Sequence, residues 1–231
     1  MYFVHILQII KKIVKIRITI LLLKILHLLV REKILEVNNL KIKICRDVFS
    51  PFYTFSSELL AYAAHSQVKS SDLVLDLGTG SGFLALIVSR KARFTVASDI
   101  SIRAAHCALE NLKRNMLQLF CDVVACDLTS AFRDKAFSLV IFNPPYLEGT
   151  PRNELEKAFF GGPKIVKEFF IDAGRILKKD GRILLAYSTL GPVSSLFLEA
   201  KRNGWVFTRI SEKRTLWETL TTYKFTRDFK N

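Results

Sequence analysis

The sequence predicts an α/β fold in which a doubly wound, mainly parallel sheet of seven strands carries helices on both faces. Three observations lead to this prediction. From Leu73 onward, short apolar runs alternate with segments of helical spacing. Four consecutive apolar runs end in a polar side chain, at the position where such sheets bind their ligands. The last two apolar runs have no helix between them, which predicts one antiparallel strand near the C-terminus.

Capping and turn residues place the elements in order. Ser101 precedes a long amphipathic segment and is suited to cap the N-terminus of a helix. Pro163 lies near the start of a later predicted helix that Gly181 closes, and Gly204 closes the next one. The predicted strands cover 73–78, 94–100, 121–128, 137–143, 182–188, 205–214 and 218–227. The predicted helices cover 83–92, 101–117, 163–181 and 191–204.

The charge of the chain is uneven. The net charge is +14 over 231 residues, and residues 1–50 hold ten Lys/Arg against three Asp/Glu. Such an excess suits RNA, a ribosome-associated partner or an acidic partner without selecting one of them. Half of the residues are hydrophobic, which excludes a disordered chain. No repeat or linker divides residues 39–231, so we expect them to form one domain.

The four cysteines are Cys45, Cys107, Cys121 and Cys126. They form no Cys-x-x-Cys pair, and no histidine lies near them at the spacing of zinc ligands. We therefore expect no metal site. We expect buried, reduced thiols of the kind that cytoplasmic proteins carry.

Residues 1–38 form an apolar, basic N-terminal extension, for which we expect a helix. Its apolar run is interrupted by Lys11, Lys12, Lys15, Arg17 and Lys24. The apolar stretches between these charges are much shorter than the ~20 residues that span a bilayer. The charges lie on two sides of a helical wheel, so the helix is not cleanly amphipathic. We favour a packed helix or a poorly ordered extension over a membrane-surface helix. A cleaved signal peptide is disfavoured, because the apolar run is not followed by a small-residue cleavage site.

The glycine-rich segment "DLGTGSG" (76–82) follows the first predicted strand. Gly78, Gly80 and Gly82 let the backbone approach a ligand, and their G-x-G-x-G spacing differs from that of dinucleotide folds. Asp76 would repel a pyrophosphate but attract a cationic ligand. Asp99 ends the second strand, where an acid accepts ribose hydroxyls, and Asp127 ends the third and can accept from an adenine amine. A ligand with a ribose, an adenine and a positive centre is S-adenosylmethionine.

The segments "VLDLGTGSG", "ASDIS", "ACDL" and "NPPY" (143–146) occur in this order. They resemble a class I methyltransferase, and most closely the HemK-like glutamine methyltransferases of peptide-chain release factors in their short archaeal and eukaryotic branch. The resemblance covers about residues 45–231 and includes "EKAFFGGPKIVKEFF". It implies a Rossmann-like methyltransferase fold with S-adenosylmethionine as cofactor. It also implies that the substrate is the glutamine side-chain amide (N5) in the Gly-Gly-Gln loop of a class 1 release factor, and that a small zinc-binding activator subunit pairs with a sheet edge.

The same resemblance implies which residues bind the cofactor. In this family the glycine-rich turn holds the methionine end, the acid after the second strand takes the ribose, and two residues after the third strand hold the adenine. The implied cofactor-binding residues are Thr54, Asp76, Gly78, Gly80, Asp99, Ile100, Asp127, Leu128 and Asn143.

The corner Asn143-Pro144-Pro145-Tyr146 is the implied substrate-binding and catalytic segment. Asn143 would accept one N–H of the substrate amide through its side-chain oxygen, the Pro144 carbonyl would accept the other, and Tyr146 would pack on the amide plane. An amide nitrogen is a poor nucleophile, because its lone pair is delocalised into the carbonyl. Two fixed acceptors orient that lone pair and stabilise positive charge on nitrogen. Asn143 cannot act as a base, so the proton is expected to leave to water.

The segment "VFSPFYTFSSELL" (48–60) departs from the family pattern. Pro51 and Thr54 match, but Phe52 and Tyr53 stand where the family has acids. Phe52, Tyr53 and Phe55 line the substrate mouth or belong to the core, and the sequence leaves both open. The departure bears on the identity of the substrate and not on the type of reaction.

Two other functions compete with release-factor methylation. An adenine-N6 methyltransferase acting on RNA or DNA is the first, because the adenine amine is also planar and conjugated. Against it, the chain has no separate target-recognition domain, and base flipping usually needs more surface than this chain offers. A non-catalytic methyltransferase-like binding subunit is the second, although it would leave the three cofactor acids without a role.

Overall fold

The computed structural model describes residues 2–30 and 32–228. Its helices are α1 (Tyr2–Val30), the 3-10 turn η1 (Pro51–Tyr53), α2 (Phe55–Gln67), α3 (Phe83–Ser89), α4 (Ile102–Arg114), α5 (Glu154–Lys157), α6 (Gly162–Ile176) and α7 (Val193–Arg202). Its strands are β1 (Ile34–Val37), β2 (Leu40–Lys43), β3 (Leu73–Leu77), β4 (Phe94–Asp99), β5 (Cys121–Ala125), β6 (Phe137–Phe142), β7 (Leu177–Ser188), β8 (Trp205–Arg214) and β9 (Thr219–Arg227).

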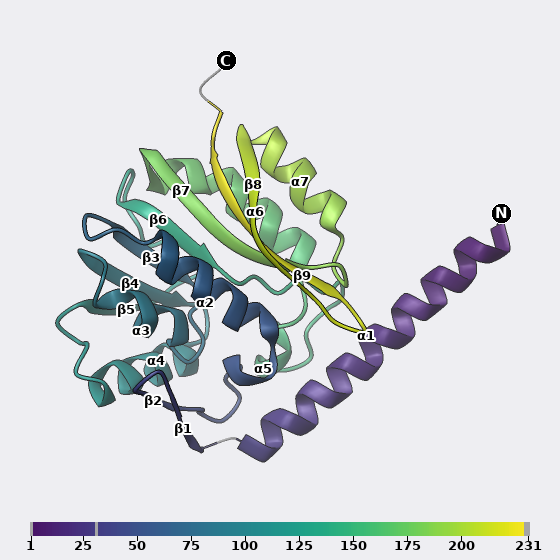
Figure 1. Ribbon diagram of the computed structural model, residues 1–231, viewed down its shortest axis with the longest axis horizontal. Coiled ribbons are helices and arrows are strands. Elements are labelled where there is room, and N and C mark those ends of the chain that lie inside the picture. Colours follow the sequence, from purple (N-terminus) through teal and green to yellow (C-terminus); the bar gives the residue numbers. More distant parts are fainter. Residues whose placement is uncertain (1, 31, 229–231) are drawn as a thin grey trace.

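One seven-stranded sheet forms the centre of the molecule, in the order β5-β4-β3-β6-β7-β9-β8. All pairs from β5 to β7 are parallel, and β9 runs antiparallel to both of its neighbours. The predicted fold class is therefore confirmed, including the antiparallel strand near the C-terminus. Figure 1 shows the twisted sheet with β5 at one edge and β8 at the other.

The faces of the sheet bury two separate apolar clusters because strand side chains alternate in direction. In β3, Val74 packs with α2, α3 and Leu112 of α4 on one face. Its neighbours Leu75 and Leu77 pack with α6 and α7 on the other face. Strands that are covered on both faces read as continuous apolar runs, which is why the sequence located them well.

The helix predicted over 163–181 ends earlier than expected. α6 ends at Ile176 and β7 begins at Leu177, so the "LKKDG" segment belongs to the strand. Leu177 pairs with Phe137, but the next pair is Arg182 with Leu139, so four residues bulge out of register. Because Lys178, Lys179 and Asp180 in this bulge are exposed and charged, they fit the helical pattern as well as the strand pattern.

Helix α1 packs on the domain through one end. Leu23 and His27 are buried against Leu147, Phe159 and neighbouring side chains, and Lys24 forms an ion pair with the nearly buried Glu156. Figure 1 shows the N-terminal half of α1 projecting beyond the rest of the molecule. None of the helices that the structure describes is both long and apolar enough to cross a membrane. The division of the chain at residue 38 stays a prediction; it falls in the turn between β1 and β2.

The β1–β2 hairpin attaches to α4 through two asparagines. Asn111 accepts from the Lys43 N–H at 2.8 Å and donates to the Lys43 carbonyl at 2.9 Å. Asn115 makes the same two bonds to Lys41, both at 2.9 Å. A carboxamide offers a donor and an acceptor as a peptide group does. The two asparagine side chains therefore make with the backbone of β2 the hydrogen bonds that a neighbouring strand would make.

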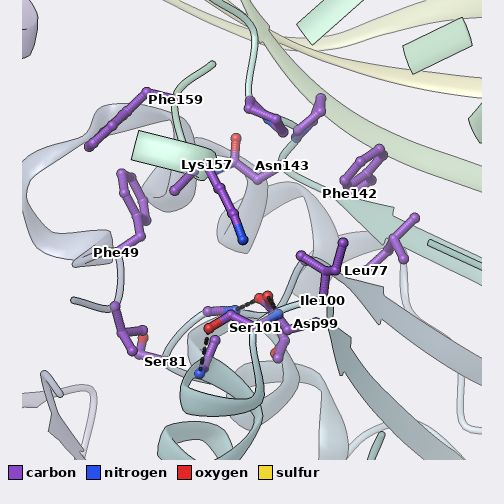
Figure 2. Close-up of a pocket in the computed structure, with 18 of the residues that line it drawn as sticks. Phe49, Leu77, Ser81, Asp99, Ile100, Ser101, Phe142, Asn143, Lys157 and Phe159 are labelled. Atoms are coloured by element: carbon purple, nitrogen blue, oxygen red, sulfur yellow. Dashed lines mark hydrogen bonds between the residues drawn. The ribbon is translucent and has the colours of Figure 1, made fainter. Parts of the chain in front are cut away.

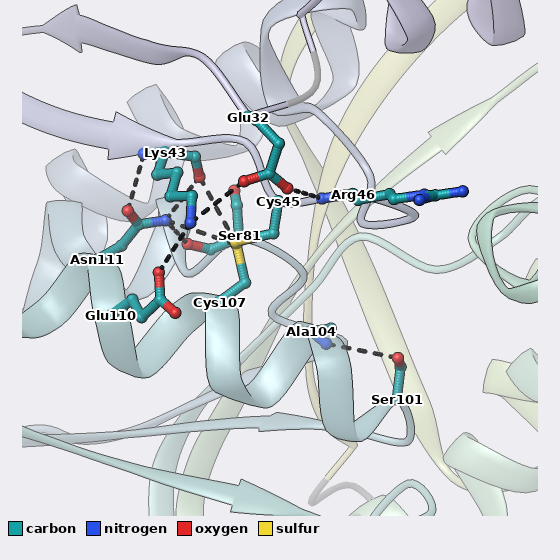
Figure 3. The surroundings of a disulfide bond; sticks show 10 residues. All are labelled: Glu32, Lys43, Cys45, Arg46, Ser81, Ser101, Ala104, Cys107, Glu110 and Asn111. Carbon is teal, nitrogen blue, oxygen red and sulfur yellow. Dashed lines mark hydrogen bonds and ion pairs between the residues drawn. A yellow bond between two sulfur atoms is a disulfide. The ribbon is translucent and has the colours of Figure 1, made fainter.

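A disulfide between Cys45 and Cys107 corrects the expectation of four reduced thiols. The asparagine contacts bring the segment after β2 onto α4, where the two Cα atoms lie 5.9 Å apart, within the range of a disulfide (Figure 3). Cys121 and Cys126 carry free thiols, and Cys121 is buried as expected. Closing a loop with a sequence separation of 62 stabilises the fold by about 4 kcal/mol in the chain-entropy treatment.

Candidate active site

A cavity lies at the carboxyl ends of the parallel strands β3, β4, β5 and β6. It brings together nearly every residue that the sequence singled out. The predicted residues that line it are Thr54, Gly78, Gly80, Asp99, Ile100, Asp127, Leu128, Asn143, Pro144, Pro145 and Tyr146. Asp76 is the exception, because it lies beneath the glycine-rich turn and outside the cavity lining.

The glycine-rich turn places bare backbone at the cavity wall. Gly78 and Gly80 have φ angles of +67° and +57°, which disfavour any residue with a Cβ. A Cβ at Gly80 would have only the Phe49 carbonyl oxygen near it, at 3.9 Å, so the space beside this residue is open. The turn therefore leaves room for a ligand against the backbone.

Asp99 is anchored at the end of β4 by two backbone donors. Its Oδ2 accepts from the Gly80 N–H and its Oδ1 from the Ser101 N–H, both at 2.9 Å (Figure 2). Burial raises the pKa of the Asp99 carboxyl, although these two bonds oppose the shift. A carboxylate fixed in this way presents its remaining lone pairs in one direction, as recognition of paired hydroxyls requires.

Asp76 stabilises the turn from below. Its Oδ2 accepts from the Thr79 hydroxyl at 2.6 Å and from the Ala85 N–H at 2.9 Å. Its Oδ1 is buried and has no hydrogen-bond partner among the described residues. Burial raises the pKa of Asp76 to about 7, against the effect of these hydrogen bonds. The side chain holds the glycine-rich turn onto the start of α3.

The charges around the cavity favour a cationic ligand. Among the described residues that line the cavity, one side chain is a cation and five side chains are carboxylates. The cation is Lys157, which points into the cavity in Figure 2 and pairs with Glu154 at 2.6 Å. The lining carboxylates are Asp47, Asp99, Asp127, Glu154 and Glu168. Asp47 pairs with Arg103 at 2.9 Å and Glu168 with Lys164 at 3.8 Å, so Asp99 and Asp127 are the lining acids that have no ion-pair partner among the described residues.

Asn143 follows β6 and is held by the first turn of α2. Its amide nitrogen donates to the Ser57 hydroxyl oxygen at 3.1 Å and approaches that of Ser56 at 3.4 Å. Its Oδ1 is buried and accepts no hydrogen bond within the part of the chain that the structure describes. An unsatisfied buried acceptor is unfavourable by roughly 1–3 kcal/mol, so this oxygen is suited to receive a donor from a ligand.

The backbone after Asn143 is packed tightly from behind. A Cβ at Gly162 would lie 2.7 Å from the Pro145 carbonyl oxygen, and one at Gly191 would overlap the backbone of Tyr146. The Tyr146 ring lies 6.0 Å from the Tyr187 ring, and burial raises the pKa of the Tyr146 hydroxyl. Gly162, the first residue of α6, therefore lets the helix support the Asn-Pro-Pro-Tyr corner at close range.

Phe52 and Phe55, two of the aromatic residues upstream, do not line the cavity. Phe52 packs on Phe83 in the core, with ring centroids 5.9 Å apart. Phe55 is exposed, and the Lys213 ammonium lies 3.5 Å above its ring. The side chain of Tyr53 lies outside the described residues. The alternative in which Phe52 belongs to the core is correct.

Several lining residues escaped the sequence analysis. Phe49 and Phe159 form an aromatic wall with His27 of α1. The Ser50 N–H donates to His27 Nε2 at 2.7 Å, and His27 Nδ1 donates to the Leu23 carbonyl at 2.7 Å. Burial lowers the pKa of His27, which keeps this bridge neutral. A helix remote in sequence therefore fixes the loop that carries Phe49, and no local pattern indicates that contact.

The chain is similar in sequence to known methyltransferases. The profile of the methyltransferase small domain family matches residues 39–204. The release factor glutamine methyltransferase of Lactococcus lactis is 30% identical over 125 residues, which is 53% of this chain and 45% of that protein. The tRNA1(Val) (adenine(37)-N6)-methyltransferase of Shewanella amazonensis is 30% identical over 102 residues, 43% of this chain and 44% of that protein. The matched segments span less than half the length of these relatives.

The fold is also similar to that of a solved structure, the Mtq2–Trm112 complex of E. cuniculi, responsible for methylation of the eRF1 translation termination factor. The TM-score is 0.62 at 20% identity, and the match covers 79% of this chain and 100% of that chain. The similarity shows a shared fold, so the sheet is that of a Rossmann-like methyltransferase.

Proposed function

The chain belongs to the methyltransferase small domain family, and we propose that it methylates the side-chain amide (N5) of the glutamine in the Gly-Gly-Gln loop of a class 1 peptide-chain release factor. Its cofactor is S-adenosylmethionine. The observation that carries the choice of acceptor group is the buried Asn143 Oδ1, which lacks a donor within the described chain. A planar NH₂ group supplies such a donor. This substrate would also place the enzyme in the cytoplasm.

The residues of the cavity fit the cofactor. When bound, S-adenosylmethionine supplies an electrophilic methyl group on a positively charged sulfur. Asp99, held by Gly80 and Ser101, is suited to accept the ribose hydroxyls. Asp127 can accept from the adenine amine, with Leu128 and Ile100 as its apolar neighbours in the lining. The acidic lining favours the positive charge, and the open backbone of the glycine-rich turn accommodates the methionine end.

The Asn143 corner is suited to hold a planar amine in place. Asn143 Oδ1 would accept one N–H and the Pro144 carbonyl the other, since no donor from the described residues reaches that carbonyl. Pro144 and Pro145 fix the corner, and Ser57 fixes the carboxamide. No carboxylate is required to remove a proton, because the nitrogen becomes acidic once it carries the methyl group. We propose catalysis by orientation and electrostatic stabilisation.

The "NPPY" corner backed by Gly162 supports a planar amine as substrate, and two of the similar proteins, the release factor glutamine methyltransferase and the Mtq2–Trm112 complex, support the glutamine amide. The test is mass spectrometry of the host's class 1 release factor after deletion of this gene. We expect methylation of the Gln in its Gly-Gly-Gln loop to disappear and to return with the intact gene. A Gln that stays methylated contradicts the proposal.

A purified system tests the assigned role of Asn143. Asn143→Ala is expected to reduce methyl transfer to the release factor by about 10³-fold or more, since a positioned polar group is removed. Cofactor affinity measured by calorimetry should change by only a few fold. An equal loss of cofactor affinity would show that Asn143 serves the cofactor and not the substrate.

An adenine-N6 methyltransferase is the second candidate function. The tRNA methyltransferase relative and the basic charge of the chain favour it. The adenine amine is planar and conjugated, so the same corner would hold it. Incubating the enzyme with labelled cofactor and either release factor or total tRNA separates the two. Label in tRNA and none in the release factor would assign the second function.

We also propose that a small activator subunit pairs with the β5 edge of the sheet. β5 is an outermost strand, and an edge strand presents unpaired backbone groups. The exposed side chains of Met116, Leu119 and Phe120 flank it. Co-expression with the host's candidate subunit should increase soluble yield, and Leu119→Lys should abolish the increase. An active, monodisperse protein without any partner argues against the subunit.

A further inference from the structure

The outer face of α1 is apolar and open to solvent. Between residues 13 and 29, where most of its side chains are described, the large exposed aliphatic residues include Val14, Ile18, Leu21, Leu22, Ile25 and Leu29. Leu21 and Leu29 are each 60% exposed. An apolar strip of this length on a surface indicates an interaction site.

The strip has a regular geometry. At the α-helical rotation of about 100° per residue, these six side chains fall within an arc of about 100°. Ile13, which is 46% exposed, lies outside this arc. Leu23 and His27 lie on the opposite side and are buried against the domain. Both faces of α1 are therefore apolar, one for packing and the other toward solvent, which explains why the whole helix shows no clear amphipathic pattern.

The charges beside the strip are all of one sign. Residues 1–31 contain six Lys/Arg and no Asp/Glu. Arg17 borders the strip on one flank and is exposed, and Lys15 borders it on the other. The Lys24 ammonium, by contrast, is used inside the molecule in its ion pair with Glu156. The surface that faces solvent thus combines aliphatic side chains with flanking cations.

We infer that α1 docks flat on the surface of an anionic lipid bilayer. The aliphatic strip would enter the interfacial layer, and Lys15 and Arg17 would contact the anionic headgroups. Interfacial helices usually have a polar face toward water, and here the packed domain takes that position. The helix is not suited to cross the bilayer. Pairing with a second copy would bring the cationic flanks together, and a nucleic acid would gain nothing from the aliphatic side chains.

The test is co-sedimentation of the full-length protein with vesicles. One vesicle preparation contains phosphatidylcholine alone, and the other contains phosphatidylcholine mixed with phosphatidylserine. We expect the protein to sediment with the anionic vesicles and much less with the neutral ones. The triple variant Leu21→Gln, Ile25→Gln and Leu29→Gln should weaken binding by about tenfold or more. The double variant Lys15→Gln and Arg17→Gln should weaken binding to the anionic vesicles by a similar factor.

A matched control replaces exposed aliphatic residues on other helices. Ile171→Gln with Leu198→Gln removes aliphatic surface that is 59% and 48% exposed on α6 and α7, and should leave binding unchanged. Sedimentation velocity of the same proteins without lipid tests self-association. The inference is wrong if neither vesicle binds the protein or if the triple variant binds as the parent does. A dimer that the triple variant abolishes would assign the strip to a second copy instead. If the triple variant does not fold, the Lys15 and Arg17 variant decides.

Discussion

The Asn143 amide nitrogen donates to the Ser57 hydroxyl oxygen at 3.1 Å, which leaves the carboxamide oxygen without a partner in the described chain. The two residues are 86 positions apart in sequence. Ser57 lies on α2, and its oxygen is also 3.4 Å from that of Thr54. The first turn of α2 therefore sets the orientation of the corner that ends β6.

Ser57→Ala is expected to lower kcat by about tenfold, because one positioning hydrogen bond worth roughly 1–1.5 kcal/mol is lost. The affinity for cofactor should not change. Steady-state kinetics with release factor and calorimetry with cofactor measure the two quantities. The control is Ser66→Ala on the same helix, whose hydroxyl only donates to the Ala63 carbonyl. Equal kcat values for the two variants would contradict the positioning role.

Asp99→Asn is expected to weaken cofactor binding by roughly 10- to 100-fold. The substitution places an amide nitrogen opposite the N–H of Gly80 or of Ser101, and it removes the charge that strengthens hydrogen bonds to hydroxyls. Calorimetric titration with S-adenosylmethionine measures the change. Asp122→Asn, on the exposed face of β5, is the matched control and should bind as the parent does. If both variants keep full affinity, Asp99 does not contact the cofactor.

Asp76 makes stability depend on pH. Its pKa is raised from 3.8 to about 7, so between these values the folded state binds the proton more strongly than the unfolded state does. The contribution is fully present below pH 3.8 and is lost as pH rises toward 7, by up to about 1.4 kcal/mol per unit. The free energies of unfolding of the parent protein and of Asp76→Asn, both measured with urea, should therefore converge or cross as pH increases from 5 to 8. A constant difference between the two free energies of unfolding over this pH range would contradict the raised pKa of Asp76.

The comparison between variants is needed because His27 acts in the opposite direction. Its pKa is lowered by burial, so its contribution to stability decreases as pH falls through 6.5. Both proteins carry His27, and its effect cancels in the difference between them.

Gly162→Ala is expected to destabilise the protein and to reduce methyl transfer. The added methyl group would lie 2.7 Å from the Pro145 carbonyl oxygen, so either α6 or the Asn143 corner must move. We expect a loss of about 1–3 kcal/mol in unfolding free energy, with kcat falling more than cofactor affinity. Gly174→Ala in the same helix is the control: its methyl group would displace the Arg227 guanidinium from the Asn203 carbonyl and the Trp205 ring, so it should also lower stability but leave the Asn143 corner and kcat unchanged. Similar kcat values for the two variants would argue against support of the corner by α6.

Much of this architecture could be predicted because the chemistry is local in the sequence. The central strands β3, β6 and most of β7 are buried on both faces, so their apolar runs are continuous, and Asp99 and Asn143 stand where β4 and β6 end. Ser101 caps α4 as predicted, with its hydroxyl 3.4 Å from the Ala104 N–H. The cavity follows from these strand ends, since they meet at one edge of the sheet.

The contacts that the sequence did not reveal all join distant segments. Cys45 and Cys107 meet only because Asn111 and Asn115 attach the β1–β2 hairpin to α4. His27 of α1 supports the loop that carries Phe49, and the sequence pattern of α1 does not indicate this contact. The end of α6 was misplaced for a different reason: an exposed polar bulge satisfies helical and extended patterns equally, and only pairing with β6 decides between them.

The position of β9 has a consequence for synthesis on the ribosome. β9 separates β7 from β8, yet it follows β8 in the chain. When β8 emerges, the strand that will join it to the rest of the sheet has not yet been made. The edges of β7 and β8 that will pair with β9 therefore stay unpaired until residues 219–227 emerge. A nascent chain stalled between the two strands would expose both edges to aggregation, and chaperones that bind extended segments would find their target there.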